Sequence, residues 1–161
     1  MSTIKNQKYL NLILLFSIFA LIAAYFIQYV LGHQPCNMCL IERIPYISAI
    51  IIISLCLFFK KFEKISLIAL TLIFFSAALI SFYHFGIEQG FIEETLVCNL
   101  EFENNLSTKE ALLNQLKETV ISCKDVTFKI FGLSLATINI FISLILSIIT
   151  IKLFLNYEKN K

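Results

Sequence analysis

Four long apolar stretches limit what this chain can fold into more than any other feature of its sequence. They cover about residues 9–31, 41–59, 65–85 and 130–155. An α-helix rises about 1.5 Å per residue, so each stretch reaches roughly across a hydrocarbon core of about 30 Å. Hydrophobic residues make up 58% of the chain and charged residues 15%, against about 45–50% and about 25% in soluble domains. The sequence therefore predicts an all-α membrane protein, a four-transmembrane-helix bundle forming a single integral membrane domain.

The first apolar stretch has two readings. Lys5 and Lys8 precede it, as basic residues precede the hydrophobic region of a cleaved signal peptide. The stretch 9–31 is far longer than the hydrophobic region of a signal peptide, and no small-x-small cleavage motif follows it. We therefore expect a retained transmembrane helix.

The charged residues are divided unequally between the two sides that four spans define. Eight basic and two acidic residues lie on the side of the termini, a net charge of +6. Five basic and nine acidic residues lie on the side of loops 32–40 and 86–129, a net charge of −4. The positive-inside rule then predicts cytoplasmic termini and places both loops outside, where disulfides persist. No basic patch is interleaved with aromatic residues, so we expect no nucleic-acid partner.

The long loop 86–129 contains a predicted short amphipathic helix. Ser107–Glu110 has the pattern of a capping box, and Leu112, Leu116 and Val120 then fall on one helical face. Such a helix between two spans is expected to lie flat on the lipid surface. The alternative is that its apolar face packs on the protein's own loop.

Four of the five cysteines lie in the two outer loops, as the close pair Cys36–Cys39 and the wide pair Cys98 and Cys123. This arrangement allows a redox relay from the wide pair to the close pair, a four-cysteine zinc site, or two inert structural bridges. Zinc sites usually combine two close pairs, and inert bridges give no reason for a Cys-x-x-Cys motif beside an arginine at the lipid boundary. We therefore favour the relay and expect no metal. Cys56 lies within the second span and is expected to be a packing residue.

The wider motif around the close pair contains Glu42 and Arg43. If Cys39 opens a helix, Arg43 lies on the same face four residues later. A c-type haem is excluded because Leu40 stands where the Cys-x-x-Cys-His signature needs histidine. The motif therefore predicts a thiolate, a fixed positive charge and lipid within a few ångströms of one another. The alternative for Arg43 is an interfacial anchor that reaches the headgroups.

Three segments together resemble the disulfide bond formation protein B (DsbB) family of inner-membrane thiol–quinone oxidoreductases. The Cys-x-x-Cys-x-x-Glu-Arg motif occupies Cys36–Arg43. Tyr83–Gly90 is similar to the sequence with which many members leave the third span, and Phe131–Ala136 is similar to the start of their fourth. The resemblance covers nearly the whole chain, including the four spans and the cysteine pair in each outer loop.

The resemblance implies a bacterial inner-membrane enzyme that reoxidises a periplasmic thioredoxin-fold thiol oxidase of the DsbA type. It implies that electrons pass on to a membrane quinone, ubiquinone or menaquinone, and that the active cysteines are periplasmic. The partner's thiolate would attack Cys98 of a Cys98–Cys123 disulfide. Cys123 would then attack Cys36 and leave Cys39 as a thiolate facing the quinone. Arg43 would stabilise that thiolate and polarise a quinone carbonyl, in agreement with the effect of a fixed cation on a thiol.

Three further residues are candidates for the quinone-binding part of the site. Glu42 either orients Arg43 or lies in the headgroup layer. His84 and Glu88 lie four residues apart at the outer end of the third span, and either relay protons or cap the helix at the interface. His33 is expected to be an ordinary loop residue.

Two other functions fit parts of the sequence. Vitamin K epoxide reductases are also four-helix quinone enzymes, but their active Cys-x-x-Cys usually lies late in the chain, whereas here it precedes the second span. A membrane scaffold whose disulfides only brace its loops is the alternative outside the enzymes.

Overall fold

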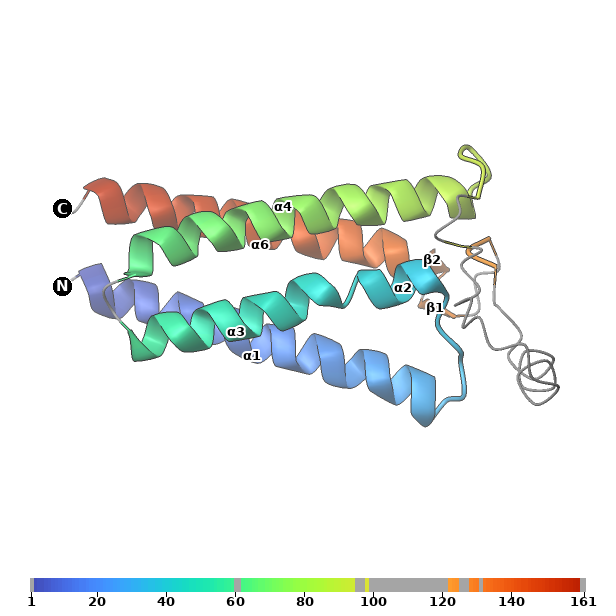
Figure 1. The fold of residues 1–161 in the computed structure, drawn as a ribbon, viewed down its shortest axis with the longest axis horizontal. Coiled ribbons are helices and arrows are strands. Elements are labelled where there is room, and N and C mark those ends of the chain that lie inside the picture. Colours follow the sequence, from blue (N-terminus) through green and yellow to red (C-terminus); the bar gives the residue numbers. More distant parts are fainter. Residues whose placement is uncertain are drawn as a thin grey trace, which may run out of the picture.

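The fold is a bundle of long helices in a computed structural model that describes residues 2–59, 62–94, 98, 122–124, 128–130 and 132–159 (Figure 1). The elements are α1 (Ser2–Tyr29), α2 (Asn37–Ile41), α3 (Ile44–Phe58), α4 (Glu63–Glu88), β1 (Lys129–Ile130), β2 (Leu133–Ser134) and α6 (Leu135–Lys159).

Four helical segments are long and apolar enough to cross a membrane. They are Gln7–Tyr29, Asn37–Phe58, Glu63–Glu88 and Leu135–Lys159, the second of them made of α2 and α3 together. Both ends of the chain lie at one end of the bundle, and α2 and the strands lie at the other (Figure 1). The predicted fold class, a multi-pass membrane protein built as a four-helix bundle, is confirmed.

The fourth helix begins later than the apolar pattern suggested. Lys129 pairs with Ser134 and Ile130 with Leu133 in an antiparallel hairpin, so α6 starts at Leu135 instead of at about residue 130. Gly132 has φ of +83°, a left-handed conformation that glycine adopts without steric cost. The predicted amphipathic helix of the long loop lies outside the described residues.

The second span is interrupted between α2 and α3. Pro45 lies in the first turn of α3, has no backbone N–H, and in a continuous helix its ring would crowd the carbonyl of Ile41. A proline at this place therefore favours a break in the helix. At the break the backbone N–H of Arg43 donates to the Leu40 carbonyl, a shorter connection than that of an α-helix. The interruption redirects the side chains of Glu42 and Arg43 relative to Cys39.

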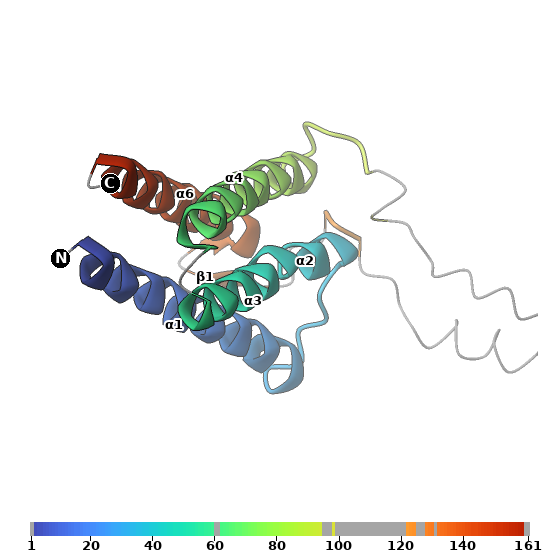
Figure 2. The ribbon, with the colours of Figure 1, turned by 60° about the vertical axis from the view of Figure 1, so that its left-hand side comes forward.

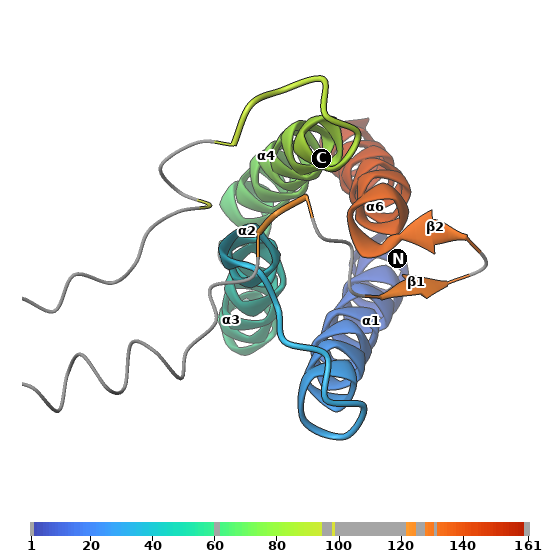
Figure 3. The same cartoon turned by 90° about the vertical axis from the view of Figure 1, so that its right-hand side faces the viewer.

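The helices pack as two close pairs. α4 lies along α6, and α1 lies along α3 (Figures 2 and 3). Small buried residues on α4 and α6 allow the two helices to approach closely, as expected where packing rather than the hydrophobic effect drives association. They are Ala77, Ala78, Ser81, Ser143, Ser147 and Thr150.

Buried apolar side chains form two clusters, one towards each end of the bundle. The larger cluster includes Leu10, Ile53, Leu70 and Phe74, together with Cys56, which is 5% exposed and packs as predicted. The smaller cluster contains Cys36, Met38, Ile87, Cys98 and Cys123. The second cluster brings both cysteine pairs to the end of the bundle opposite the termini (Figure 1).

A candidate disulfide-exchange site beside an apolar cavity

The two cysteine pairs meet in a single buried cluster. Cys98 and Cys123 form a disulfide, the pairing that the resemblance implies, and are 0% and 2% exposed. Cys36 and Cys39 are free thiols whose Sγ atoms are 2.7 Å apart. Because two of the four thiols are already bonded to each other, this arrangement does not provide the four-thiolate ligand set of the zinc reading. The structure therefore brings one formed disulfide and one dithiol together.

Cys36 caps the start of α2. Its sulfur accepts a hydrogen bond from the backbone N–H of Cys39 at 3.3 Å, and Cys36 itself has extended backbone angles. The close pair is therefore held by helix capping, with Cys36 just outside the helix and Cys39 in its first turn.

His84 on α4 contacts Cys36 at the start of α2. Its Nε2 atom lies 3.5 Å from the Cys36 sulfur, and its Nδ1 atom lies 2.9 Å from Oε1 of Glu42. His84 is 1% exposed, so its ring is enclosed by the protein. Glu88, one turn further along α4, places Oε1 3.8 Å from Nε2 of His84. The imidazole therefore lies between a thiol and two carboxylates.

These contacts lower the pKa of the Cys36 thiol. The hydrogen bond from Cys39 lowers the pKa of Cys36 most, burial opposes it, and His84 lowers the pKa further. In this dithiol state the thiol that favours ionisation is Cys36. The expected Cys39 thiolate belongs to the state in which Cys36 is bonded to Cys123, and it stays a prediction.

Arg43 points towards α1. Its Nη1 atom donates to Oε1 of Gln28 at 2.7 Å, and its guanidinium lies 5.0 Å from the centre of the Tyr25 ring. The expectation that Arg43 shares a helical face with Cys39 assumed an unbroken helix, and the interruption imposed by Pro45 removes that condition. Arg43 and Cys39 nevertheless both line the same cavity.

Glu42 points into the bundle instead of towards Arg43 or the headgroups, the two positions we had considered. It is 9% exposed, and its two oxygens contact His84 and Asn139. Asn139 lies on α6 and also donates to the Ser81 hydroxyl at 2.8 Å. Sequence reasoning missed Asn139. A polar amide inside an apolar span was the signal that could have identified it.

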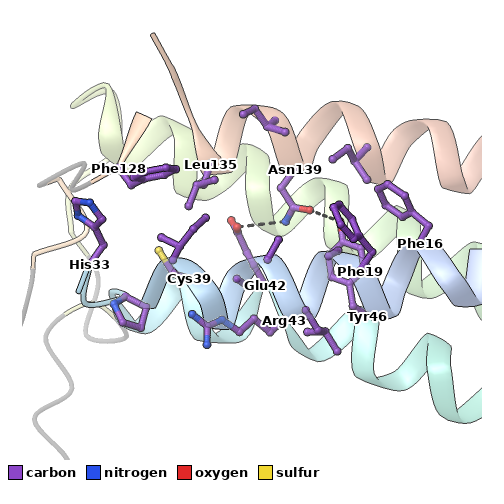
Figure 4. Close-up of a pocket in the computed structure, with 18 of the residues that line it drawn as sticks. Phe16, Phe19, His33, Cys39, Glu42, Arg43, Tyr46, Phe128, Leu135 and Asn139 are labelled. Carbon is purple, nitrogen blue, oxygen red and sulfur yellow. Dashed lines mark hydrogen bonds between the residues drawn. The ribbon is translucent and has the colours of Figure 1, made fainter. Parts of the chain in front are cut away.

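A cavity of about 360 Å³ opens beside Cys39, between α1, the α2–α3 segment and α6 (Figure 4). Its polar lining includes Glu42, Arg43, Tyr46 and Asn139. Its walls are mainly apolar, and include Phe16, Phe19, Ala20, Ile27, Leu135, Ile138 and Ile142. Apolar walls with a few polar groups at one place are typical of sites for small organic ligands.

His33 lies at the loop end of this cavity. Its ring is 5.1 Å from that of Phe128, and both residues contribute to the lining (Figure 4). We had expected His33 to be an ordinary loop residue, and its place in the lining could not be read from the sequence. Phe128 precedes β1, so the hairpin positions one wall of the cavity.

Comparisons with known proteins agree with this geometry. The family model for disulfide bond formation protein DsbB matches residues 6–153. An uncharacterized protein of Rickettsia prowazekii (strain Madrid E) is 30% identical over 162 residues, which cover 98% of this chain and 94% of that protein. No solved structure matches the chain. With a family match over nearly its full length and two cysteine pairs assembled at one end of four transmembrane helices, the chain belongs to the DsbB family of disulfide bond formation proteins.

Proposed function

We propose that this protein is a thiol:quinone oxidoreductase that reoxidises a DsbA-type thiol oxidase in the periplasm. One observation supports this function above all. Cys39 lines an apolar cavity while Cys36, its partner in the motif, packs with the Cys98–Cys123 disulfide. The close pair thus connects the outer disulfide to a space that suits a lipid-soluble acceptor.

The first exchange takes place at the wide pair. A thiolate of the partner attacks Cys98, the Cys98–Cys123 bond breaks, and a mixed disulfide forms while Cys123 leaves as a thiolate. The partner's second thiolate then releases Cys98 and closes the partner's own disulfide. Two electrons and two protons have moved from the partner's dithiol to Cys98 and Cys123.

The second exchange passes the same two electrons to the close pair. Cys123 attacks Cys36 of a Cys36–Cys39 disulfide, and Cys39 leaves as a thiolate. Cys98 then attacks Cys123, which restores the wide disulfide and leaves Cys36 and Cys39 as a dithiol. The described structure has the bonding of this stage, with Cys98–Cys123 bonded and Cys36 and Cys39 free.

The cavity beside Cys39 fits a quinone. Its volume and apolar walls suit a flat ring with a hydrocarbon tail, and Arg43 and Tyr46 supply hydrogen-bond donors for ring oxygens. When bound, a quinone accepts two electrons and two protons and so regenerates the Cys36–Cys39 disulfide. A DsbA-type partner has a potential of about −120 mV, so its reoxidation needs an acceptor more oxidising than ordinary protein disulfides.

The test is a coupled assay in detergent with a reduced DsbA-type partner and a short-chain ubiquinone or menaquinone. Quinone consumption that matches partner oxidation, and that is lost in Cys39→Ser, would support the proposal. Cys56→Ser is the matched control because Cys56 lies in the other cluster, and this variant should keep full activity. Partner-independent function, with no quinone consumed, would favour the scaffold reading.

A further inference from the structure

We propose that Asn139 is a positioning residue that holds the Glu42 carboxylate between His84 and the cavity, so that the Cys36 proton leaves through the bundle interior. This inference rests on the proposed function for its electron acceptor. It assigns a role to a residue of α6 that carries no cysteine chemistry of its own.

A continuous line of contacts leads from the thiol to the amide. The Cys36 sulfur is 3.5 Å from Nε2 of His84, and Nδ1 of His84 is 2.9 Å from Oε1 of Glu42. The other carboxylate oxygen, Oε2, accepts a hydrogen bond from Nδ2 of Asn139 at 3.2 Å. His84 uses one ring nitrogen for Cys36 and the other for Glu42. A proton that Nε2 receives from Cys36 can therefore be matched by a proton that Nδ1 releases to Glu42.

The orientation of the Asn139 amide is fixed by hydroxyl groups. Its Oδ1 atom accepts hydrogen bonds from the Tyr46 hydroxyl and, at 3.4 Å, from the Ser143 hydroxyl. Its Nδ2 atom donates to Ser81 at 2.8 Å as well as to Glu42. With its oxygen occupied by donors, the amide presents its N–H groups to the carboxylate. A carboxyl group that is 9% exposed needs such donors to satisfy its oxygens by hydrogen bonds.

Glu42 and Asn139 are the members of this line that also line the cavity beside Cys39. Glu42 and Cys39 both line the cavity, and Figure 4 shows the Glu42 carboxylate on the same side as Asn139. Oxidation of the dithiol forms the Cys36–Cys39 bond, and the two electrons and the Cys39 proton pass to the acceptor in the cavity that Cys39 lines. The second proton, that of Cys36, leaves through His84. Nε2 of His84 takes the Cys36 proton, and Nδ1 gives a proton to Oε1 of Glu42. The proton and the electrons therefore arrive at one cavity wall.

Other titratable groups face the same histidine and carboxylate. Cys36 and Cys39 approach from the α2 end, Tyr46 from α3, and Glu88 from α4 at 3.8 Å from Nε2 of His84. Glu88 is the competing proton acceptor. Among the described residues it does not line the cavity, so a proton held there would be separated from the electrons. The neighbouring Arg43 is directed to Gln28 and Tyr25.

The test uses full-length protein that is reduced and stripped of quinone, with Asn139→Leu as the isosteric change. Thiolate formation at Cys36 is followed against pH by alkylation and peptide mass spectrometry. Without the amide, Glu42 loses a hydrogen-bond donor and no longer holds the His84 ring in place against the Cys36 sulfur. We expect the midpoint for Cys36 to rise by about one pH unit. Ser147→Ala, buried on the same face of α6, is the matched control and should leave the midpoint unchanged.

A second readout follows the carboxyl group itself. The infrared carboxyl band of Glu42, identified by its absence in Glu42→Gln, should shift in Asn139→Leu because a hydrogen-bond donor to Oε2 has been removed. Ser81→Ala removes one anchor of the amide and should shift the Cys36 midpoint in the same direction by less. It keeps the test valid if Asn139→Leu fails to fold. An unchanged midpoint in a folded Asn139→Leu or Ser81→Ala protein would overturn the proposal.

Neither readout requires quinone or partner, so the two proposals can fail separately. In the coupled assay, Asn139→Leu should slow the quinone-dependent step about tenfold or more while mixed-disulfide formation at Cys98 keeps its rate. A shifted midpoint in a protein that reduces no quinone would support the Asn139 assignment and overturn the acceptor. Quinone reduction together with an unshifted Cys36 midpoint would support the quinone acceptor and overturn the Asn139 assignment.

Discussion

At the scale of single residues, the two thiols of the motif share the cysteine cluster but differ in their other contacts. Cys36 caps α2 and contacts His84, and it packs with the outer disulfide. Cys39 lines the cavity. In the proposed function this difference separates two tasks, since exchange with Cys123 would take place at Cys36 and electron release at Cys39.

His84 should control the ionisation of Cys36. The pKa of Cys36 lies below that of an ordinary thiol, so the thiolate is present above this lowered pKa and is lost as the pH falls through it. In His84→Phe we expect the alkylation profile of Cys36 to move to higher pH by about one unit. His33→Phe is the control, because His33 contacts Phe128 instead. An unmoved profile in His84→Phe would show that Cys39 alone sets the acidity of Cys36.

The residues with reactive or charged side chains could be predicted from the sequence. The polar residues that position them through hydrogen bonds could not. A Cys-x-x-Cys pair followed by Glu42 and Arg43 is recognisable without a structure. Asn139 carried the general signal of a polar amide in an apolar span, but its contact with Tyr46 could not be predicted, because it joins α3 and α6 across a separation of 93 residues. Such contacts depend on how the helices rotate against each other, and the apolar pattern does not specify that rotation.

At the scale of elements, the break between α2 and α3 decides where the charged residues of the motif point. Glu42 turns inward to His84, and Arg43 turns to Gln28 on α1. Spans could be predicted because length and apolarity are sufficient for them. The break and the β1–β2 hairpin could not, because both lie in segments where Pro45 or Gly132 overrides the apolar pattern.

Replacing Pro45 should uncouple Arg43 from Gln28. In the native chain, a double-mutant cycle with Arg43→Met and Gln28→Leu should give a coupling of about 1.5–3 kcal/mol in thermal unfolding, as expected for a hydrogen bond to a charged group. Pro45→Ala permits a continuous helix that redirects Arg43, and the same cycle in that background should give a coupling near zero. Equal coupling in both backgrounds would mean that the break does not depend on Pro45.

The outer end of α4 depends on a close approach at Gly86. The chain folds back there, with the backbone N–H groups of Phe91 and Ile92 donating to the Gly86 carbonyl. A Cβ at Gly86 would lie 2.7 Å from Cδ1 of Ile92, and Ile92 packs against the cysteine cluster. Gly86→Ala should displace Ile92, lower the midpoint of thermal unfolding by a few degrees and speed reduction of Cys98–Cys123.

The control for this change is Ser76→Ala on the exposed side of α4. Reduction of the disulfide can be timed with a water-soluble phosphine. If Gly86→Ala matched Ser76→Ala in both measurements, Ile92 would have room to move and the close approach would not matter.

At the scale of the whole molecule, the chain places its redox chemistry at one end of the bundle and its termini at the other (Figure 1). Lys64 and Glu158 join α4 to α6 at the end of the termini. Four spans and the charge difference between the two sides predicted this polarity. The pairing of α1 with α3 and of α4 with α6 was not predictable, since apolar helices in lipid can associate through many faces.

The orientation in the membrane is testable with single cysteines in a variant that lacks the natural five. Phe91→Cys lies beyond α4 at an 83% exposed position, and Lys159→Cys lies at the end of α6. An impermeant maleimide added to intact cells should label position 91 and should reach position 159 only after permeabilisation. The opposite pattern would place the native cysteines in a reducing compartment and would rule out a periplasmic partner.

The position of the cavity against α1 has a consequence for how turnover depends on concentration. Phe19 lines the cavity and is 67% exposed on the outer surface of the bundle, so one wall adjoins the acyl chains. A hydrophobic substrate that enters there is supplied from the two-dimensional pool of the bilayer. Saturation should then follow the mole fraction of that substrate in lipid. Diluting a proteoliposome with more phospholipid should slow the enzyme even though no substrate has been removed from the tube.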